Sequence, residues 1–269
     1  MLLAGGQTLL RDMKRGGHSA DRLIDITGIT AKQIELRDRA ISIGAGATHA
    51  EVARSAIVRE HLPTLAALVG HIGDPAVRHR GTLGGALAAN EPAGDYPAAC
   101  LALDAVVHTT MRDVAATEFF VGECRTLLEP GEIIIGTTFA IARRAAYIKF
   151  LNPATRYAMV GVFAAVAADG APRVAVTGAH ADGAFRWREA ETALGDAFVA
   201  EQLHAVRLSP DRLVEDLFAD AKYRAHLAQA LARRAVALAA GPAPGVIVLS
   251  QGAPARTDSL PQRILAQQG

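Results

Sequence analysis

Cysteine is scarce in this 269-residue chain, which has only Cys100 and Cys124. Two widely spaced cysteines exclude a disulfide scaffold, and they exclude any four-cysteine zinc or iron–sulfur site within the chain. A free cysteine is most often a small, buried, apolar residue. We therefore expect both cysteines to be buried and to take no part in chemistry.

The chain also has no excess of charge of one sign and no long apolar run. Its net charge is +1, without the clustered basic residues that nucleic acid requires. The apolar run 98–107 is too short to span a membrane and is interrupted by Asp104. The first residues do not follow the signal-peptide pattern. We expect a soluble, cytoplasmic protein without a membrane span.

Periodicity and turn residues predict a mixture of strands and helices. Thr48 and Glu51 form a capping-box pattern, and Pro63 predicts a break in the helical stretch that follows. The segment 71–95 is predicted to be rich in loops, with a helical or buried segment from Tyr96 onward. Strands are predicted at 21–26, 40–45 and 105–110 and after the turn at 129–131.

A change of pattern near residues 143–146 indicates a second domain. Residues 160–167 and 173–178 are predicted to pair as an antiparallel hairpin, and 189–194 to form a helix. Apolar residues at helical spacing, which include Leu217, predict a long helix within 211–239. We assign 1–143 to the first domain, 146–240 to the second, and 241–269 to a polar tail with the short apolar run "VIVL".

Two glycine-containing segments are candidates for binding phosphate. The first is Ala4-Gly5-Gly6-Gln7-Thr8, and the second contains Gly81, Gly84 and Gly85. Small residues with free backbone N–H groups form nests that bind phosphate oxygens. Each segment alone is more often a tight turn, and neither matches the G-x-x-x-x-G-K-[ST] or G-x-G-x-x-G pattern. Together they favour a ligand with two phosphates.

Three longer stretches resemble one known family. "LAGGQTLL", "HIGDPAVRHRGTLGGALAANEPAGDYPAACLALDA" and "FFVGECRTLLEPGEII" are similar to the FAD-binding medium subunit of molybdenum hydroxylases of the carbon monoxide dehydrogenase and xanthine dehydrogenase type. "YIKFLNPATRYAMVGVFAAVA" and "YRAHLAQALARRAVALA" resemble that family's C-terminal domain. The resemblance covers roughly residues 2–240 and its motifs occur in the family's order.

The resemblance implies an α+β fold and a set of cofactor-binding residues. The fold would be a two-lobed FAD-binding domain of the vanillyl-alcohol-oxidase (PCMH) type, followed by a small α+β CO-dehydrogenase-flavoprotein C-terminal domain. The flavin pyrophosphate would lie on the two glycine segments, Asp95 would hold cofactor hydroxyls, and Lys149 would lie at the isoalloxazine edge and favour the reduced, anionic flavin. The matching positions are Ala4, Gly5, Gly6, Gln7, Thr8, Ile72, Thr82, Leu83, Gly84, Gly85, Asp95, Ile134 and Lys149.

Several of these residues also have simpler interpretations. Asp95 also suits a turn or a helix cap, and Lys149 an ordinary solvated position. By residue type alone, Ile72 and Ile134 belong to a core. Arg78 and Arg80, next to the second glycine segment, would either screen pyrophosphate charge or pair with carboxylates.

Relatives usually begin earlier, with a strand and a helix before the strand that leads into the first glycine segment. We therefore expect the first domain to be N-terminally truncated here. Either the start of the chain is misassigned or the protein is naturally short, with an exposed sheet edge.

By resemblance, the chain would not oxidise the organic substrate itself. A molybdopterin-binding large subunit and a [2Fe-2S] small subunit would deliver electrons to FAD, in a dimer of heterotrimers. The external acceptor is a quinone, NAD, oxygen or a carrier protein. The alternatives are a flavin-free structural subunit of such a complex, and a self-sufficient flavin oxidase.

Overall fold

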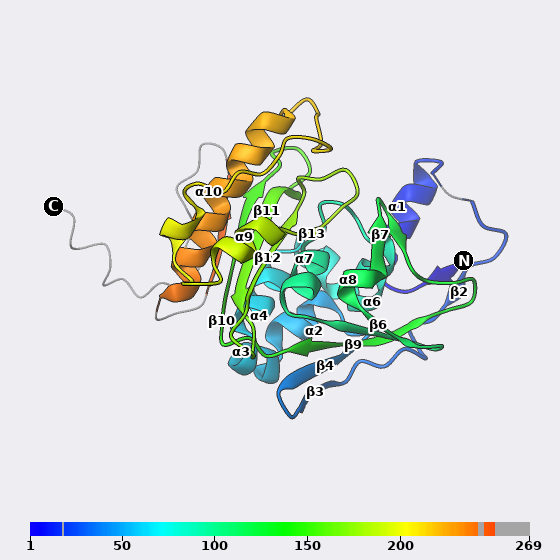
Figure 1. Cartoon of the computed structure of the whole chain (residues 1–269). Helices are drawn as coiled ribbons and strands as arrows, with labels where there is room; N and C mark the ends of the chain where they lie inside the picture. The colour runs from blue at the N-terminus through cyan, green and yellow to red at the C-terminus, as the bar shows by residue number, and fades with distance from the viewer. Residues whose placement is uncertain (18, 242–244, 251–269) are drawn as a thin grey trace.

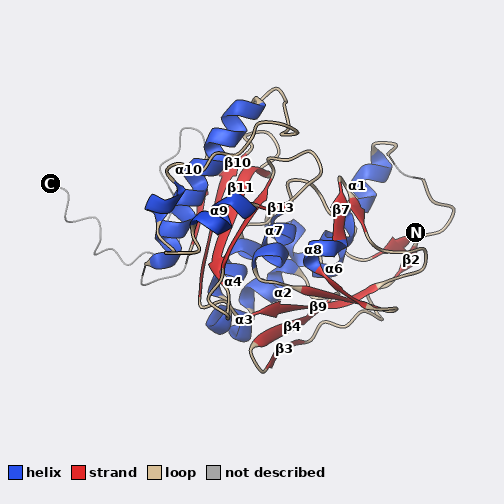
Figure 2. Ribbon diagram, viewed as in Figure 1, coloured by secondary structure: helices blue, strands red, loops and turns tan. Residues whose placement is uncertain are grey.

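Two five-stranded sheets enclose a layer of helices in this protein (Figure 1). The computed structural model describes residues 1–17, 19–241 and 245–250. A further pair of helices, α9 (Arg188–Ala193) and α10 (Ala221–Ala240), covers the outer face of the second sheet (Figure 2). None of the helices in the described ranges is long and apolar enough to cross a membrane.

The first sheet is antiparallel and has the strand order β3-β4-β9-β5-β6. Its central strands β4 and β9 pair through Ser42 with Thr138 and Ile43 with Thr137. The predicted strands at 40–45 and 105–110, and the strand after the turn at 129–131, are confirmed. The bounds are β3 (Ile34–Arg37), β4 (Ala40–Gly44), β5 (Val106–Thr109), β6 (Asp113–Ala115) and β9 (Ile134–Ala140).

Five helices lie between the two sheets or along the first one, namely α2 (His49–Arg54), α3 (Ala56–His61), α4 (Pro63–Gly70), α6 (Leu83–Ala89) and α7 (Asp95–Ala102). The predicted capping box at Thr48 and Glu51 is present, and Pro63 begins a new helix. A second break falls at Ser55, which caps α3 and was not predicted. All residues of α7 are buried, because sheets or helices surround it on every side.

The segment 71–95 is more helical than expected. It contains α5 (Pro75–Arg80), which Asp74 caps through the backbone N–H of Val77, and α6, which Thr82 caps through Gly85. Short helices of six and seven residues carry too little periodicity to be detected in a glycine-rich sequence.

The second sheet has the strand order β13-β12-β11-β10-β14. The predicted antiparallel hairpin is confirmed as β11 paired with β12, with Val162 opposite Val176. The run "VIVL" forms β14, which pairs in parallel with β10. The tail expected from residue 241 therefore includes a sheet strand, and its residues 251–269 lie outside the described part. The bounds are β10 (Arg144–Leu151), β11 (Ala158–Val166), β12 (Pro172–Thr177), β13 (Phe185–Arg186) and β14 (Val246–Leu249).

The long helix is shorter at its start than predicted. It begins at Ala221, where the Asp220 side chain accepts a hydrogen bond from the Tyr223 N–H. Residues 211–220 form loops, and Leu217 is fully exposed rather than packed. The Asp216 carboxylate accepts the N–H groups of Phe218 and Ala219, and this turn competes with a helix.

The remaining elements are short. A parallel pair, β1 with β2, carries the chain start beside α1, and the predicted strand at 21–26 is reduced to β2. A small hairpin, β7 with β8, follows α8. Their bounds are β1 (Leu2–Leu3), α1 (Leu9–Lys14), β2 (Ile24–Asp25), α8 (Ala116–Phe119), β7 (Phe120–Gly122), β8 (Arg125–Thr126) and the 3₁₀ helix η1 (Ala200–Leu203).

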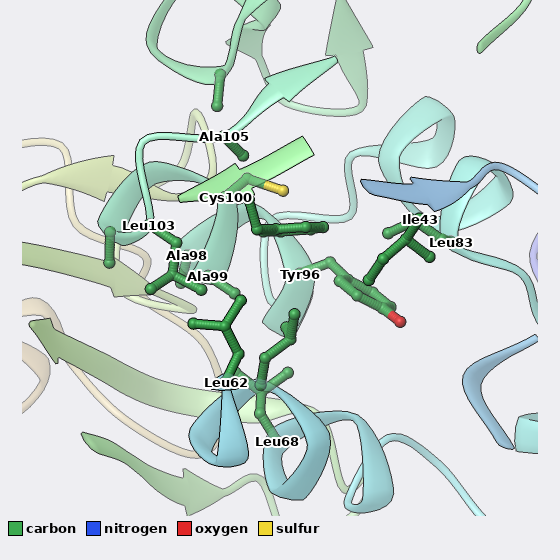
Figure 3. Close-up of a cluster of buried hydrophobic side chains, with 14 of the residues drawn as sticks. Ile43, Leu62, Leu68, Leu83, Tyr96, Ala98, Ala99, Cys100, Leu103 and Ala105 are labelled. Atoms are coloured by element: carbon green, nitrogen blue, oxygen red, sulfur yellow. The ribbon is translucent and has the colours of Figure 1, made fainter. Parts of the chain in front are cut away.

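One buried cluster joins the first sheet to the second (Figure 3). It contains Tyr96 and Leu103 from the central layer together with Phe163 of β11. Cys100 is fully buried in it, as predicted. The expectation for Cys124 is wrong: this residue is exposed, at φ 49°, in the tight β7–β8 turn.

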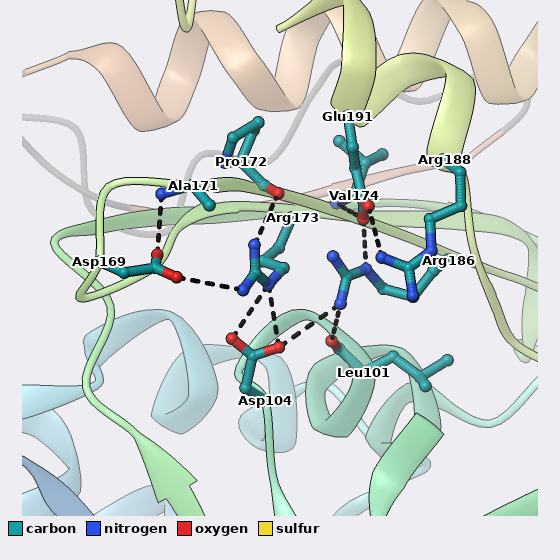
Figure 4. A network of polar contacts seen from close by, with 10 residues as sticks. All are labelled: Leu101, Asp104, Asp169, Ala171, Pro172, Arg173, Val174, Arg186, Arg188 and Glu191. Atoms are coloured by element: carbon teal, nitrogen blue, oxygen red, sulfur yellow. Dashed lines mark hydrogen bonds and ion pairs between the residues drawn. The ribbon is translucent and has the colours of Figure 1, made fainter. Parts of the chain in front are cut away.

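A polar network also connects the central helices to the second sheet (Figure 4). The Asp104 carboxylate, just after α7, accepts hydrogen bonds from Arg173 of β12 and from Arg186 of β13. The Glu191 carboxylate pairs with both Arg186 and Arg188. The buried cluster of Figure 3 and this network therefore hold the two halves of the chain in one arrangement, whereas the second apolar cluster lies within the second half.

Candidate functional site

The first glycine segment forms a tight turn between β1 and α1. Gly6 has φ 73°, in the left-handed region that favours glycine. The backbone N–H groups of residues 5–8 donate to no acceptor within the described ranges. Gly5 is buried and Gly6 partly so. A turn with several unused N–H donors is suited to bind an anion.

The second glycine segment uses its backbone N–H groups differently from the first. Leu83 donates to the carbonyl of Ala47 at 2.9 Å, and Gly84 donates to the carbonyl of Ala45 at 2.8 Å. The N–H of Gly85 donates to the hydroxyl of Thr82 at 3.1 Å. The expectation of free donors in this segment is therefore wrong for these three residues. The start of α6 docks onto the residues after β4 through Leu83 and Gly84, and the Thr82 side chain caps α6 through Gly85.

The fold places the two glycine segments directly against each other. A Cβ atom added to Gly5 would lie 2.0 Å from the carbonyl oxygen of Arg80, so the two backbones pack without space for a side chain. A Cβ added to Gly85 would lie 4.0 Å from the Cβ of Ala4. The small residues of α6 therefore line one side of the turn whose N–H groups are free.

Asp95 and Lys149 form a buried ion pair across the two sheets' shared core. The Lys149 Nζ lies 2.7 Å from Oδ2 of Asp95, and the Tyr147 hydroxyl donates to Oδ1. Asp95 is 5% exposed and Lys149 is 2% exposed. Burial, and then the Asp95 charge, raise the pKa of the Tyr147 hydroxyl well above its usual value. Lys149 is therefore neither solvated nor an unpaired cation.

The two isoleucines lie in apolar surroundings. Ile134 begins β9, is 5% exposed and belongs to the buried cluster of Figure 3, while Ile72 is half-buried and packs against that cluster. Arg78 donates to the carbonyls of Ile72 and Gly73 rather than to a carboxylate. The side chain of Arg80 is exposed.

These segments match known proteins. Residues 1–139 match the family model described as the FAD binding domain in molybdopterin dehydrogenase. The chain belongs to this family. Over 87% of both chains it is 33% identical to the carbon monoxide dehydrogenase medium chain of Hydrogenophaga pseudoflava. It is 32% identical to the nicotine 6-hydroxylase medium subunit of Paenarthrobacter nicotinovorans, over 87% of this chain and 88% of that one.

Solved structures show the same family and fold. Carbon monoxide dehydrogenase from Hydrogenophaga pseudoflava superposes with a TM-score of 0.79 at 33% identity, over 89% of this chain and 88% of that one. Quinoline 2-oxidoreductase from Pseudomonas putida 86 gives 0.78 at 25% identity, over 88% of each chain. The chain is thus a medium FAD subunit of the molybdenum hydroxylase type, with the predicted α+β fold and FAD as its cofactor.

The free donors of the first segment fit the FAD of this family. A pyrophosphate needs several N–H donors and close approach to backbone, and the turn at 5–8 beside Gly85 offers both. The donors in this turn are backbone N–H groups and not cationic side chains. Backbone dipoles would therefore provide the attraction for the pyrophosphate.

Arg11 and His49 lie near the two glycine segments, and the sequence alone did not identify either as part of this region. Arg11 of α1 donates to the Glu91 carboxylate at 2.6 Å and to the Tyr157 hydroxyl at 3.2 Å, which ties the first segment to the second sheet. Burial alone would lower the pKa of Arg11, but its hydrogen bonds to Tyr157, Glu91 and Asp12 raise that pKa above the ordinary value. Partners 80 and 146 positions away cannot be recognised from local pattern.

His49 lies under the second glycine segment. A Cβ on Gly81 would lie 2.6 Å from its Nε2, and its ring centroid lies 5.5 Å from that of Tyr96. Burial, and then the charge of Arg78, lower the pKa of His49 to about 4, so the ring is neutral. Its Nδ1 and the Tyr96 hydroxyl are buried without hydrogen-bond partners among the described residues.

Proposed function

We propose that this chain is the electron-transfer subunit of a molybdenum hydroxylase complex. Its FAD accepts electrons from [2Fe-2S] clusters on a small subunit and passes them to an external acceptor. A molybdopterin-binding large subunit oxidises the organic substrate, and the complex is a cytoplasmic dimer of heterotrimers. The identities of the relatives support this, since they are medium chains or subunits of dehydrogenases and hydroxylases.

One observation carries the proposal on the side of this chain. The turn at residues 5–8 presents unused backbone N–H groups against the glycine face of α6. We assign the cofactor pyrophosphate to these two segments, that is, to Ala4, Gly5, Gly6, Gln7, Thr8, Thr82, Leu83, Gly84 and Gly85. The backbone N–H groups of the first segment bind the negative charge of the pyrophosphate. The glycines of the second segment allow the pyrophosphate to approach the backbone closely.

The remaining assigned residues shape the cofactor site without reacting. Bound FAD supplies the redox chemistry. Asp95 retains acceptor capacity for cofactor hydroxyls after Tyr147 and Lys149 each occupy one position, because a carboxylate accepts about four hydrogen bonds. Ile72 and Ile134 provide apolar contact for the rings. We assign Lys149 an indirect role, which is to hold Asp95 in place.

The number of cysteines in the chain supports placing the iron–sulfur clusters on another subunit. Each [2Fe-2S] cluster needs about four ligands, mostly cysteine thiolates. Cys100 is buried and Cys124 lies in an exposed turn, so the chain cannot supply a cluster itself. Electrons from a molybdenum centre must therefore arrive through another polypeptide.

The test is to isolate the complex through an affinity tag on this chain, from the cells that make it. We expect three polypeptides, with FAD, molybdenum and iron–sulfur absorbance, and flavin bleaching when the large subunit is given its substrate. A complex that contains no FAD would overturn electron transfer here and favour a structural subunit. Oxidation of a substrate by the isolated chain would favour a self-sufficient oxidase instead.

A further inference from the structure

Three hydrogen-bonded polar side chains lie across three strands of the first sheet, on the face opposite to its buried cluster. Nδ1 of His108, on β5, lies 2.7 Å from Oδ1 of Asp113 on β6. Nε2 of the same ring lies 2.7 Å from Oγ1 of Thr138 on β9. We call these three residues the His108 triad. The proposed electron-transfer role uses none of them.

The register of the sheet brings the three side chains together. His108 is opposite Asp113 on one neighbouring strand and opposite Gly136 on the other. Because Gly136 has no side chain, the His108 ring can lean across β9 to Thr138, two residues further along the same face. Val107 points to the other face and is fully buried, so the triad faces outward. In Figure 1 the strands β4, β6 and β9 lie along the lower side of the molecule, below the helices.

Asp113 determines which nitrogen of the His108 ring carries the proton. An ionised carboxylate only accepts hydrogen bonds, so Nδ1 of His108 donates to Asp113. In the neutral ring Nε2 is then an acceptor, and the Thr138 hydroxyl donates to it. A hydroxyl that donates to a histidine nitrogen, with a carboxylate on the other nitrogen, is the arrangement that activates serine and threonine nucleophiles.

A second hydroxyl lies beside Thr138. Ser42 of β4 is directly opposite Thr138, and the Cβ atoms of such pairs lie about 4.5–5.5 Å apart. The Ser42 hydroxyl has no hydrogen bond with another residue in the described part of the chain, so it is free to donate to a bound oxygen. Ser42 and Thr138 are partly exposed, as is 27% of the His108 side chain, so a small molecule can reach them. The next pair on this face, Ala40 and Ala140, is also small and partly exposed.

We propose that the His108 triad makes Thr138 a nucleophile that takes up an acyl group from a small activated ester. Oγ1 of Thr138 forms a bond to the carbonyl carbon, and the bond from that carbon to the leaving oxygen breaks. The proton of the Thr138 hydroxyl moves to Nε2 of His108 and from there to the leaving oxygen. Asp113 stabilises the imidazolium that forms in between. The Ser42 hydroxyl donates to the carbonyl oxygen, on which negative charge develops.

The test is to incubate the full 269-residue chain with para-nitrophenyl acetate. Absorbance follows the released nitrophenol, and mass spectrometry follows the protein. We expect a burst of nitrophenol equal to the amount of chain, because an acyl intermediate accumulates. We expect one acetyl group per chain, on the peptide that contains Thr138. Absence of acetylation, or an acetyl group only on other residues, would overturn the proposal.

Variants of the triad separate activation of Thr138 from background reaction of the ester with surface groups. Thr138→Val should abolish the acetylation, whereas Thr138→Ser keeps a hydroxyl and should retain it. His108→Gln should lower the rate of acetylation about 100-fold. Asp113→Asn should lower it at least about tenfold, because an amide can donate to Nδ1 and so favour the wrong tautomer. His61→Gln is the matched control and should leave the rate unchanged, since His61 has the carboxylate of Glu60 at 3.9 Å but no hydroxyl partner among the described residues.

The variants also give the results that would contradict the role of the triad. Acetylation of Thr138 at an undiminished rate in His108→Gln, or an equal loss of rate in His61→Gln, would overturn the proposal. Urea unfolding followed by Trp187 fluorescence checks that each variant is folded. If His108→Gln does not fold, Asp113→Asn decides, because 68% of the Asp113 side chain is exposed. The assay does not require bound FAD, so its outcome is independent of the proposed electron-transfer function.

Discussion

The buried pair of Asp95 and Lys149 should dominate the stability of the junction between the sheets. Replacing Lys149 by Met removes the cation but leaves the Asp95 carboxylate at a site that is 5% exposed. Breaking a buried ion pair by removing one partner costs about 3–5 kcal/mol. Because the Tyr147 hydroxyl still donates to Asp95, we expect the lower end, about 3 kcal/mol.

Urea unfolding measures this change, with the fluorescence of Trp187 as the probe. Trp187 is the only tryptophan and is 1% exposed, so its emission should shift on unfolding. Lys222→Met is the matched control, since Lys222 is exposed on α10 and should cost no more than about 0.5 kcal/mol.

A double-mutant cycle tests the reasoning itself. Once Asp95→Asn has removed the carboxylate, Lys149→Met should cost about 2 kcal/mol less than it does alone. If the two changes are additive, or if Lys149→Met alone costs less than about 1 kcal/mol, then the pair does not hold the junction as argued.

Three further predictions concern single sites. Gly85→Val should lower FAD occupancy several-fold, because its Cβ would lie 2.9 Å from the Thr82 hydroxyl that caps α6 and 4.0 Å from the Cβ of Ala4, so this wall of the assigned site must shift; pigment released on denaturation measures this. The pKa of His49 is lowered to about 4, so the unfolded state binds more protons between about pH 4 and 6.5. The free energy of unfolding should therefore fall by up to about 3 kcal/mol as the pH drops through that window. His49→Gln should reduce this dependence of the unfolding free energy on pH, as measured by urea titrations at several pH values. Asn90→Gly should cost about 2 kcal/mol in urea unfolding, because it keeps the left-handed backbone but removes the hydrogen bonds to the carbonyls of Gly122 and Arg125.

Each of these has a control or a contrary outcome. Gly28→Val adds a side chain in open space and should leave the bound flavin unchanged; equal loss in both valine variants would contradict the assignment of Gly85. An unchanged pH profile in His49→Gln would mean that other groups cause the acid sensitivity. For Asn90→Gly, the rate of amide hydrogen exchange should rise first in β7 and β8. A uniform rise over the whole chain would argue against a local stabilising role of the Asn90 side chain.

Local signals predicted much of the fold. The capping box at Thr48 and Glu51 and the hairpin of β11 and β12 depend on residues a few positions apart, and both are present. The helix predicted from 211 failed for an equally local reason, because the Asp216 turn and the Asp220 cap set its true start. Apolar periodicity alone counted Leu217 as a packed residue, although it is fully exposed.

Long-range contacts account for what sequence reasoning missed. The run "VIVL" resembles an isolated apolar stretch until β10 provides a partner for it. The pairing of Asp95 with Lys149 spans 54 positions, and only the fold shows that the two charges neutralise each other. Likewise, the free donors of residues 5–8 and the occupied ones of Leu83 and Gly84 both lie in glycine-containing segments, and only the fold shows that the carbonyls of Ala47 and Ala45 occupy the latter.

The position of β14 has a practical consequence. This strand pairs in parallel with β10 through Ile247 opposite Ile148, and it closes one border of the second sheet. Truncation after Gly245 would leave the backbone groups of β10 open to pairing with another molecule, and such open borders promote self-association and fibrils. A shortened version made for crystallisation or for fusion to a reporter should therefore keep residues up to Leu249.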